Sequence, residues 1–324
     1  MRIHAQPCSR GPQASTRKHD QLRQLHLLSE PRLHRWTDDP AAADIIFLTD
    51  AAHASGPLLE EHPYPRRFPE KCFVLSEQWD PPFQLAGIYA NAPRGPFWRG
   101  RFRTASYALH HPDFRNPFIE RHDPATTPDR SPDLLASFLG RNCHPVRARL
   151  LALPPTPGIL VEDTSDYNAF THEEAGREER QRRYYEICLR SKFILCPRGA
   201  GPNSIRLFEA LKLGIAPVIL SDAWVPCEGP RWDEFAVFIP EQDVDQLPAI
   251  LAGIEPTHWL RGELAQDAYR AFFAPNAYFN YLVASAVSAR SARVVPERVF
   301  VSLWPVQRLL RQARRRSLRL VRTP

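Results

Sequence analysis

The stretch FILCPRGAGPNSIRLFEALKLGIAPVILSD, residues 193–222, decides which fold the chain is expected to adopt. It begins with a short apolar run, passes through a loop that contains Gly199 and Gly201, and then shows apolar residues at helical spacing. Gly214 and a second apolar run, 216–220, follow. The order of strand, glycine loop, helix and strand predicts two parallel strands joined by a right-handed crossover.

The rest of the chain repeats this alternation of apolar runs and helical patterns. The apolar runs are continuous, which is typical of strands that are covered on both faces. The predicted strands are 44–49, 71–76, 134–139, 158–162, 193–196, 216–220 and 236–239, and the predicted helices are 144–153, 171–190, 203–213 and 243–254. The sequence therefore predicts an α/β protein with parallel sheets.

A length of 324 residues is sufficient for two domains. The segment RHDPATTPDRSPD, 121–133, is rich in proline and lacks apolar periodicity, so the domain boundary is expected there. We predict an N-terminal domain over 1–130 and a second domain over 131–285. C-terminal helices with a basic tail are expected over 286–324.

The net charge of +6 is concentrated at one end of the chain. Seven of the 42 Lys and Arg residues lie in 306–322, which leaves 35 basic against 36 acidic residues elsewhere. A nearly neutral body excludes a protein whose main surface binds nucleic acid, because that function needs a basic face across the fold. The tail has apolar residues near helical spacing with arginines largely opposite. Such a helix either binds an anionic membrane surface or packs as a solvated terminal helix.

Targeting and metal signals are weak throughout the chain. No apolar run approaches the roughly 20 residues of a membrane span, and the N-terminus lacks the apolar core of a signal peptide. The protein is therefore expected in the cytoplasm, at the inner face of the plasma membrane if the tail binds lipid. The six cysteines show no zinc-type spacing, so no metal site is predicted.

The loop and the helix start that follow residue 197 are expected to bind an anion. Gly199 and Gly201 let the backbone approach a ligand closely, and Asn203 or Ser204 can cap the helix. The unpaired amides at a helix start, together with the helix dipole, attract negative charge. The glycine loop therefore predicts a phosphate site.

Three charged side chains sharpen this expectation. Arg198 and Arg206 can each match phosphate oxygens with two parallel donors. Glu209 lies about one turn beyond, where a carboxylate can accept two hydrogen bonds from a ribose diol. The alternative is a plain salt bridge between Arg206 and Glu209, which are three residues apart on one helical face.

The whole of 193–222 resembles the exostosin family of glycosyltransferases. The hallmark of that family is a strand, the segment P-[RK]-G-x-G-x-x-S-x-R-L-[FY]-E-A-[LI], and then G-x-x-P-V-I-x-S-D. FLGRNCHPVR, 138–147, resembles the first strand and loop of the family's C-terminal domain, and 232–250 resembles its closing portion. The resemblance is strong over about 134–254.

The resemblance implies a GT-B fold, in which two Rossmann-like domains with parallel sheets face each other across a cleft. It implies an inverting transfer from a nucleotide-sugar donor, in this family a UDP-sugar, to a glycan or lipid-linked glycan acceptor. It also implies no cofactor and no obligatory metal, because cationic side chains neutralise the leaving diphosphate. The implied donor-binding residues are Arg147, Arg198, Gly199, Gly201, Ser204, Arg206, Glu209 and Asp222. Arg147 has a second interpretation, as an exposed helix residue, and Asp222 a second one, as the start of a turn.

Inversion by direct displacement needs a base that deprotonates the acceptor hydroxyl. The candidates follow predicted strands of the N-terminal half, and the resemblance does not choose among them. They are Asp50, Glu77 and Asp80, with His53, His110 and His111 behind them.

Two other functions stay open on the sequence. The pattern from Gly199 to Ser204 is similar to the nicotinamide fingerprint G-x-G-x-x-G, with Asp222 about 20 residues on. Ser204 in place of the third glycine and Pro202 within the turn weaken that oxidoreductase interpretation. The third possibility is a sugar-nucleotide or glycan-binding protein that has the fold but no base.

Overall fold

The computed structural model describes residues 1–8, 16–49, 57–79, 83–92, 94–95, 100–109, 112–123, 131–167 and 176–306. Contacts within the chain group it into two compact units. The first unit comprises Met1–Tyr89, Gly95–Arg103 and Phe279–Pro324, and the second comprises Ala90–Arg94 and Thr104–Tyr278.

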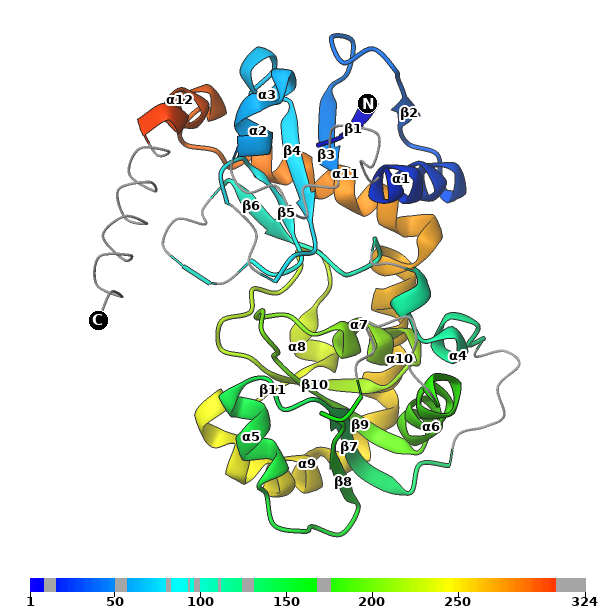
Figure 1. Ribbon diagram of the computed structural model, residues 1–324. Helices are drawn as coiled ribbons and strands as arrows, with labels where there is room; N and C mark the ends of the chain where they lie inside the picture. The colour runs from blue at the N-terminus through cyan, green and yellow to red at the C-terminus, as the bar shows by residue number, and fades with distance from the viewer. Residues whose placement is uncertain are drawn as a thin grey trace, which may run out of the picture. The chain divides into compact units, whose positions relative to one another are not determined.

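The first unit is built on a six-stranded sheet with the order β2-β1-β3-β4-β5-β6 (Figure 1). The pairs from β2 through β5 are parallel. Its strands are β1 (Arg2–Pro7), β2 (Arg35–Trp36), β3 (Ile45–Thr49), β4 (Cys72–Ser76), β5 (Gly87–Tyr89) and β6 (Phe102–Thr104). Every residue of β3 and β4 is buried, as expected for apolar strands that are covered on both faces.

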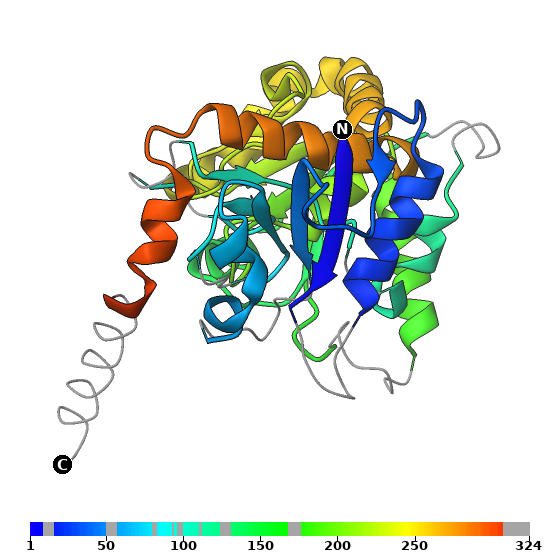
Figure 2. The ribbon, with the colours of Figure 1, turned by 90° about the horizontal axis from the view of Figure 1, so that it is seen from above.

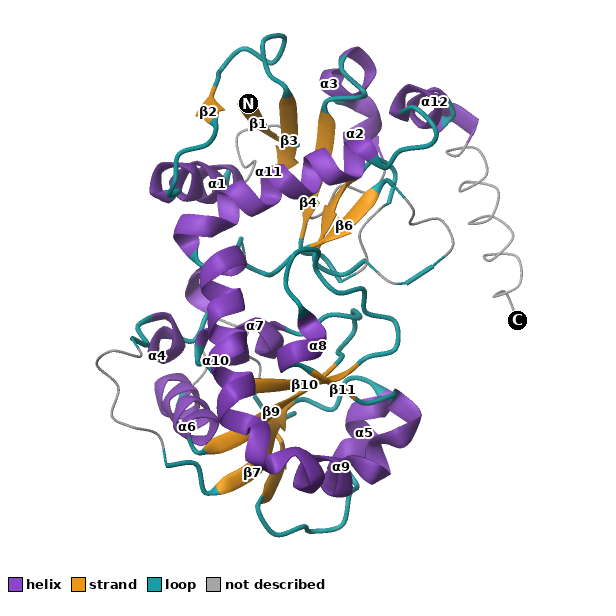
Figure 3. Cartoon of the chain, turned by 180° about the vertical axis from the view of Figure 1, so that it is seen from behind, coloured by secondary structure: helices purple, strands orange, loops and turns teal. Residues whose placement is uncertain are grey.

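Helices from both ends of the chain cover this first sheet. They are α1 (Arg17–Leu28), α2 (Pro57–Glu61), α3 (Pro63–Arg67), the C-terminal part of α11 (Pro275–Ser291) and α12 (Glu297–Ser302). The C-terminal part of α11 lies along one face of the sheet (Figures 2 and 3). Arg290 in this part donates to the carbonyl oxygen of Asp44, at 3.0 Å, just before β3 begins.

The second unit has a five-stranded sheet with the order β11-β10-β9-β7-β8, and all its pairs are parallel. Its strands are β7 (Leu134–Gly140), β8 (Ile159–Asp163), β9 (Ser191–Pro197), β10 (Ala216–Leu220) and β11 (Val237–Phe238). Its α-helices are α4 (Pro117–Glu120), α5 (Pro145–Leu151), α6 (Arg177–Leu189), α7 (Ile205–Lys212), α8 (Trp232–Phe235), α9 (Leu247–Ile254) and α10 (His258–Ala268). Single turns of other helix types span Pro112–Phe114, Glu241–Gln246, Glu255–Thr257 and Tyr269–Phe273.

Alternate residues of the central strands of the second sheet pack against different helices. Phe193 and Leu195 of β9 belong to a buried cluster with residues of α5 and α9. The intervening positions of β9 are also buried, and α6, α7 and α10 contact this strand. Coverage on both faces explains why these strands are apolar without alternation.

The prediction of an α/β protein with two parallel, Rossmann-like sheets is confirmed. The strands β1, β5 and β6 were not predicted, because they are short or contain polar residues. The helix predicted at 171–190 begins at Arg177, and 168–175 lie outside the described residues. The helix predicted at 243–254 begins only at Leu247, because Pro248 cannot donate a backbone hydrogen bond and belongs in a first turn.

The two units divide the chain differently from the boundary expected at residue 130. Residues just before that point belong to the second unit and contact one of its helices. Asn116 donates to the carbonyl oxygen of Gln181 at 2.8 Å, and Nδ1 of His122 lies 3.0 Å from the hydroxyl of Tyr185. Both partners belong to α6. Composition alone did not reveal this packing.

None of the helices in the described part of the chain is long and apolar enough to cross a membrane.

Candidate functional site

The predicted anion site lies at the carboxyl edge of the second sheet. The strand β9 ends at Pro197, and the loop that follows leads directly into α7 at Ile205. The neighbouring strands β7 and β10 end at Gly140 and Leu220. Because the three strands are parallel and adjacent, the segments that follow them meet at one edge.

The glycines of this loop are required by packing. Gly199 and Gly201 are not among the glycines with positive φ. A Cβ atom at Gly201 would lie 2.2 Å from Oδ1 of Asn91, and one at Gly199 would lie 3.2 Å from Nη2 of Arg147. A larger residue at Gly201 would therefore require Asn91 to move, and one at Gly199 would require a smaller shift of Arg147, whereas Gly214, after α7, has φ of +66°.

Ser204 begins the helix but leaves its hydroxyl uncommitted. Its backbone is extended, with φ −132° and ψ 133°, and its side chain makes no capping hydrogen bond. The residue is only 7% exposed, and Oγ has no hydrogen-bond partner among the described residues. A buried hydroxyl without a partner is costly, so its place at the start of α7 indicates a ligand that supplies the missing hydrogen bond.

Arg206 directs its guanidinium group toward the end of β7. Nη2 donates to the carbonyl oxygen of Leu139 at 2.5 Å, and the group lies 4.8 Å from the ring centre of Phe138. Its Nε is buried and has no partner within the described part of the chain. A Cβ atom at Gly140 would lie 2.4 Å from Nη2 of Arg206, so the strand end is glycine where this side chain passes.

Arg147 is committed to the backbone of the loop. Its guanidinium donates to the carbonyl oxygens of Arg198 at 2.8 Å, Pro197 at 3.1 Å and Arg141 at 3.1 Å. Burial, together with the charge of Arg206, lowers the pKa of Arg147 to about 10. Three of its five donors are used in this way. The side chain is buried, so the interpretation as an exposed helix residue is wrong.

Glu209 points to a phenol and not to the arginine on its own helix. Its Oε2 accepts a hydrogen bond of 2.8 Å from the hydroxyl of Tyr184, on α6. The carboxylate forms no ion pair with Arg206 among the described contacts, so the simple salt bridge is not observed. Burial raises the pKa of Glu209, while the hydrogen bond from Tyr184 and the charge of Arg206 act in the opposite direction.

Arg198 and Asp222 both lie next to Glu241, which belongs to the segment 232–250 that resembles the closing portion of the family. Oε1 of Glu241 lies 3.8 Å from Nη1 of Arg198 and accepts a hydrogen bond of 3.1 Å from the amide of Asp222. The amide of Glu241 in turn donates to Oδ1 of Asp222 at 3.2 Å. Asp222 is exposed, and this reciprocal pair joins the segments that follow β10 and β11.

The comparisons with known proteins concern this same region. Residues 98–254 match the model of the exostosin GT47 domain. The match covers just under half of the chain, and this part of the chain is similar to an exostosin GT47 domain. The eight predicted donor-binding residues all fall within the match, so the predicted resemblance is confirmed.

Similar proteins come from plants. A probable glucuronosyltransferase of Oryza sativa subsp. japonica is 47% identical over 73 residues, which is 22% of this chain and 17% of that protein. A probable beta-1,4-xylosyltransferase of Arabidopsis thaliana is 42% identical over 80 residues, which is 24% of this chain and 19% of that protein. The chain thus spans less than a fifth of the length of these relatives. The GT47 match favours a transferase over the nicotinamide-dependent alternative.

The predicted catalytic bases lie before the GT47 domain. Glu77 is buried and forms an ion pair of 3.2 Å with Lys18, at the start of α1. Asp50 and Asp80 lie outside the described residues, as do His53, His110 and His111. The described residues contain no group of three His, Cys, Asp or Glu side chains that could hold a metal ion.

Sequence reasoning missed several contacts that shape the site, including those of Asn203, which it offered only as a helix cap. Asn203 donates to the carbonyl oxygens of Ala90 at 2.8 Å and Ala105 at 3.3 Å, and its own Oδ1 accepts from the amide of Ser204. Tyr184 was also missed. These contacts join residues far apart in the chain, and no local pattern marks them.

Proposed function

We propose that the protein is an inverting glycosyltransferase that moves a sugar from a nucleoside diphosphate sugar to a glycan acceptor. The observation that carries this proposal is the buried hydroxyl of Ser204, without a partner in the described structure, at the start of α7. Arg198 and Arg206 flank it in the chain, and each has a buried Nε without a partner among described residues. A diphosphate supplies oxygen acceptors of the required charge at this position.

The arrangement gives each group a distinct task. The amides at the start of α7 and the side chains of Arg198 and Arg206 stabilise the negative charge that grows on the departing diphosphate. Arg147 holds the carbonyl groups of the loop, so that its amides keep their direction. Glu209, directed by Tyr184, accepts hydrogen bonds from the ribose of the donor.

The chemical step is a single displacement. The acceptor hydroxyl attacks the anomeric carbon, the bond from that carbon to the diphosphate oxygen breaks, and the acceptor proton passes to a base. Asp50, Glu77 and Asp80 are the candidates for that base, and Glu77 forms an ion pair with Lys18. The proposal includes a UDP-sugar donor carrying glucuronic acid or xylose, in line with the names of the plant relatives. It includes action in the cytoplasm without a cofactor or an obligatory metal.

A panel of nucleoside diphosphate sugars tests the proposal. The wild-type protein with an oligosaccharide acceptor mixture should release a nucleoside diphosphate from one donor. Ser204→Ala should weaken donor binding about tenfold to 100-fold, the usual cost of one hydrogen bond to a charged group. The control is Arg182→Ala, an exposed arginine on α6, which should behave as wild type. Donor binding without release would indicate a binding protein, and oxidation of NADH an oxidoreductase.

A further inference from the structure

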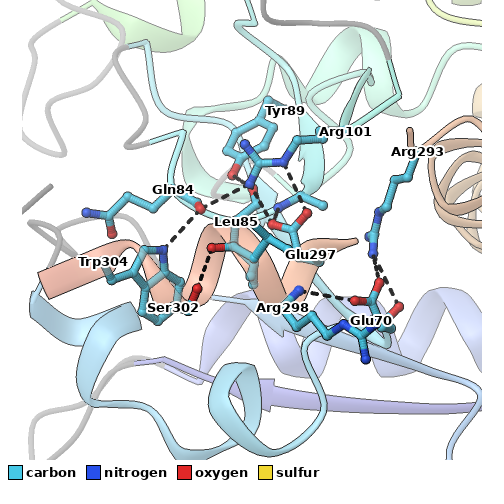
Figure 4. A network of polar contacts seen from close by, with 12 residues as sticks. Glu70, Gln84, Leu85, Tyr89, Arg101, Arg293, Glu297, Arg298, Ser302 and Trp304 are labelled. Carbon is cyan, nitrogen blue, oxygen red and sulfur yellow. Dashed lines mark hydrogen bonds and ion pairs between the residues drawn. The ribbon is translucent and has the colours of Figure 1, made fainter. Parts of the chain in front are cut away.

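The helix α12 lies beyond the GT47 domain and is fixed to the first unit by a buried ion pair (Figure 4). Glu297 is 0% exposed. Its Oε1 accepts from Nη2 of Arg101 at 2.6 Å and from the amide of Ala86 at 2.9 Å, and its Oε2 accepts from Nε of Arg101 at 3.1 Å. A carboxylate with three charge-assisted or backbone hydrogen bonds holds the start of α12 in one orientation.

The residues that follow the helix, which ends at Ser302, are fixed on the same side. The indole nitrogen of Trp304 donates to the carbonyl oxygen of Gln84 at 3.3 Å, and Nη2 of Arg101 donates to that oxygen at 3.2 Å (Figure 4). The guanidinium of Arg101 also stacks on the ring of Phe300, 3.6 Å from its centre. Glu297, Phe300 and Trp304 follow at spacings of three and four, so they share one helical face.

The opposite face is apolar and faces solvent. Val299, Leu303 and Val306 are 41%, 44% and 52% exposed and also follow at spacings of four and three. Val294 and Val295, just before the helix, are exposed as well. We name these five residues the α12 stripe. The inner contacts prevent the helix from turning this stripe toward the protein, and exposed apolar groups gathered in one place indicate an interaction surface.

The charge around the α12 stripe is positive. From Arg298 to the end at residue 324, the sequence has eight arginines and no Asp or Glu. In the described structure α3 contacts α12 and carries the exposed Arg66 and Arg67. The nearby carboxylate of Glu70 is engaged by Arg293 at 3.2 Å and by the amide of Arg298 at 3.1 Å. An apolar stripe bordered by arginines matches the interface of a membrane that carries anionic lipids.

We infer that the α12 stripe, together with Arg298 and the arginines of α3, binds the surface of an anionic lipid bilayer. The valine and leucine side chains enter the boundary between headgroups and acyl chains, and the guanidinium groups pair with lipid phosphates. This inference is independent of the transferase activity. If both hold, the enzyme works where a lipid-linked acceptor is found.

Sedimentation of the full chain with vesicles tests the inference. The protein should bind vesicles that contain roughly a third phosphatidylglycerol and should not bind pure phosphatidylcholine. The double variant Val299→Asp with Leu303→Asp should bind the anionic vesicles about tenfold more weakly, because it loses the apolar insertion and adds negative charge. The matched control is Leu260→Asp on α10, which replaces a leucine that is 61% exposed elsewhere.

Two further measurements separate loss of lipid binding from loss of folding. Thermal unfolding should show that the double variant and the control are both folded, and high salt should weaken wild-type binding. Equal binding of the double variant and wild type would overturn the inference. Light scattering tests the alternative that the α12 stripe binds a second copy of the chain. If the wild type is a dimer that does not bind vesicles, and the double variant is a monomer, the inference is contradicted.

Discussion

Two groups of buried arginines show the same side chain in two different settings. In the first unit, Arg101 meets a fully buried carboxylate, Glu297, with two hydrogen bonds. In the second unit, Arg147 and Arg206 bond to backbone carbonyl groups, and neither forms an ion pair among the described residues. The first arrangement is complete within the protein. The second leaves the guanidinium groups of Arg147 and Arg206 without an ion pair among the described residues, which suits an anion-binding site.

The largest expected effect comes from removing Glu297, the ion-pair partner of Arg101 in the first unit. Glu297→Ala should lower the free energy of unfolding by about 3–5 kcal/mol, because the charge of Arg101 stays buried without its partner. Urea denaturation measures this loss. The affinity for the donor should be unchanged in the protein that remains folded. A loss below about 1 kcal/mol would show that the pair contributes little, as exposed pairs do.

The second prediction concerns Arg206 in the second unit. Arg206→Ala should lower kcat by about 100-fold to 1,000-fold with a smaller change in donor KM, because charge grows on the diphosphate as the bond breaks. Steady-state kinetics with saturating acceptor separates the two constants. Unchanged values of both would remove Arg206 from the site. Its loss should also destabilise the fold less than the loss of Glu297.

The comparison also shows what the sequence could predict. The stretch 193–222 was correctly placed as strand, loop, helix and strand, because its signals are local: apolar runs, glycines and a helix stop at Gly214. The partners of the charged residues were not predictable in this way. Lys18 and Glu77 are 59 positions apart in the chain, and Tyr184 reaches Glu209 from another helix. Glu297 was missed because a lone acid in a C-terminal helix gives no sign of burial.

A substitution of Arg147 is expected to have a smaller effect than the loss of Arg206, because Arg147 acts on the loop backbone. Arg147→Lys keeps the charge but cannot span the carbonyl groups of Arg141, Pro197 and Arg198. We expect donor affinity to fall about tenfold, with amide exchange in the loop accelerated even without ligand. Hydrogen exchange with mass spectrometry provides the second readout. Normal affinity together with unaltered exchange would show that Arg147 does not hold the loop.

The smallest expected effect concerns pH. Burial raises the pKa of Glu209, so its carboxylate gains a proton at a higher pH than an ordinary glutamate. A protonated Glu209 accepts hydrogen bonds from ribose less well, so donor affinity should fall severalfold as pH falls through this raised pKa. Glu209→Gln should bind more weakly at neutral pH and lose this acid dependence. Donor-binding titrations of the wild type and of Glu209→Gln at several pH values test this expectation. An identical dependence of donor affinity on pH in the two proteins would exclude Glu209 as the titrating group.

The central claim is that the loop after β9 and the start of α7 bind a diphosphate. Hydrogen exchange over residues 197–212, measured with and without UDP, GDP and ADP, tests it most directly. The account predicts that at least one of these nucleotides slows exchange in this segment, and that Ser204→Ala reduces the protection. Exchange that stays the same with every nucleotide at millimolar concentration would contradict the claim.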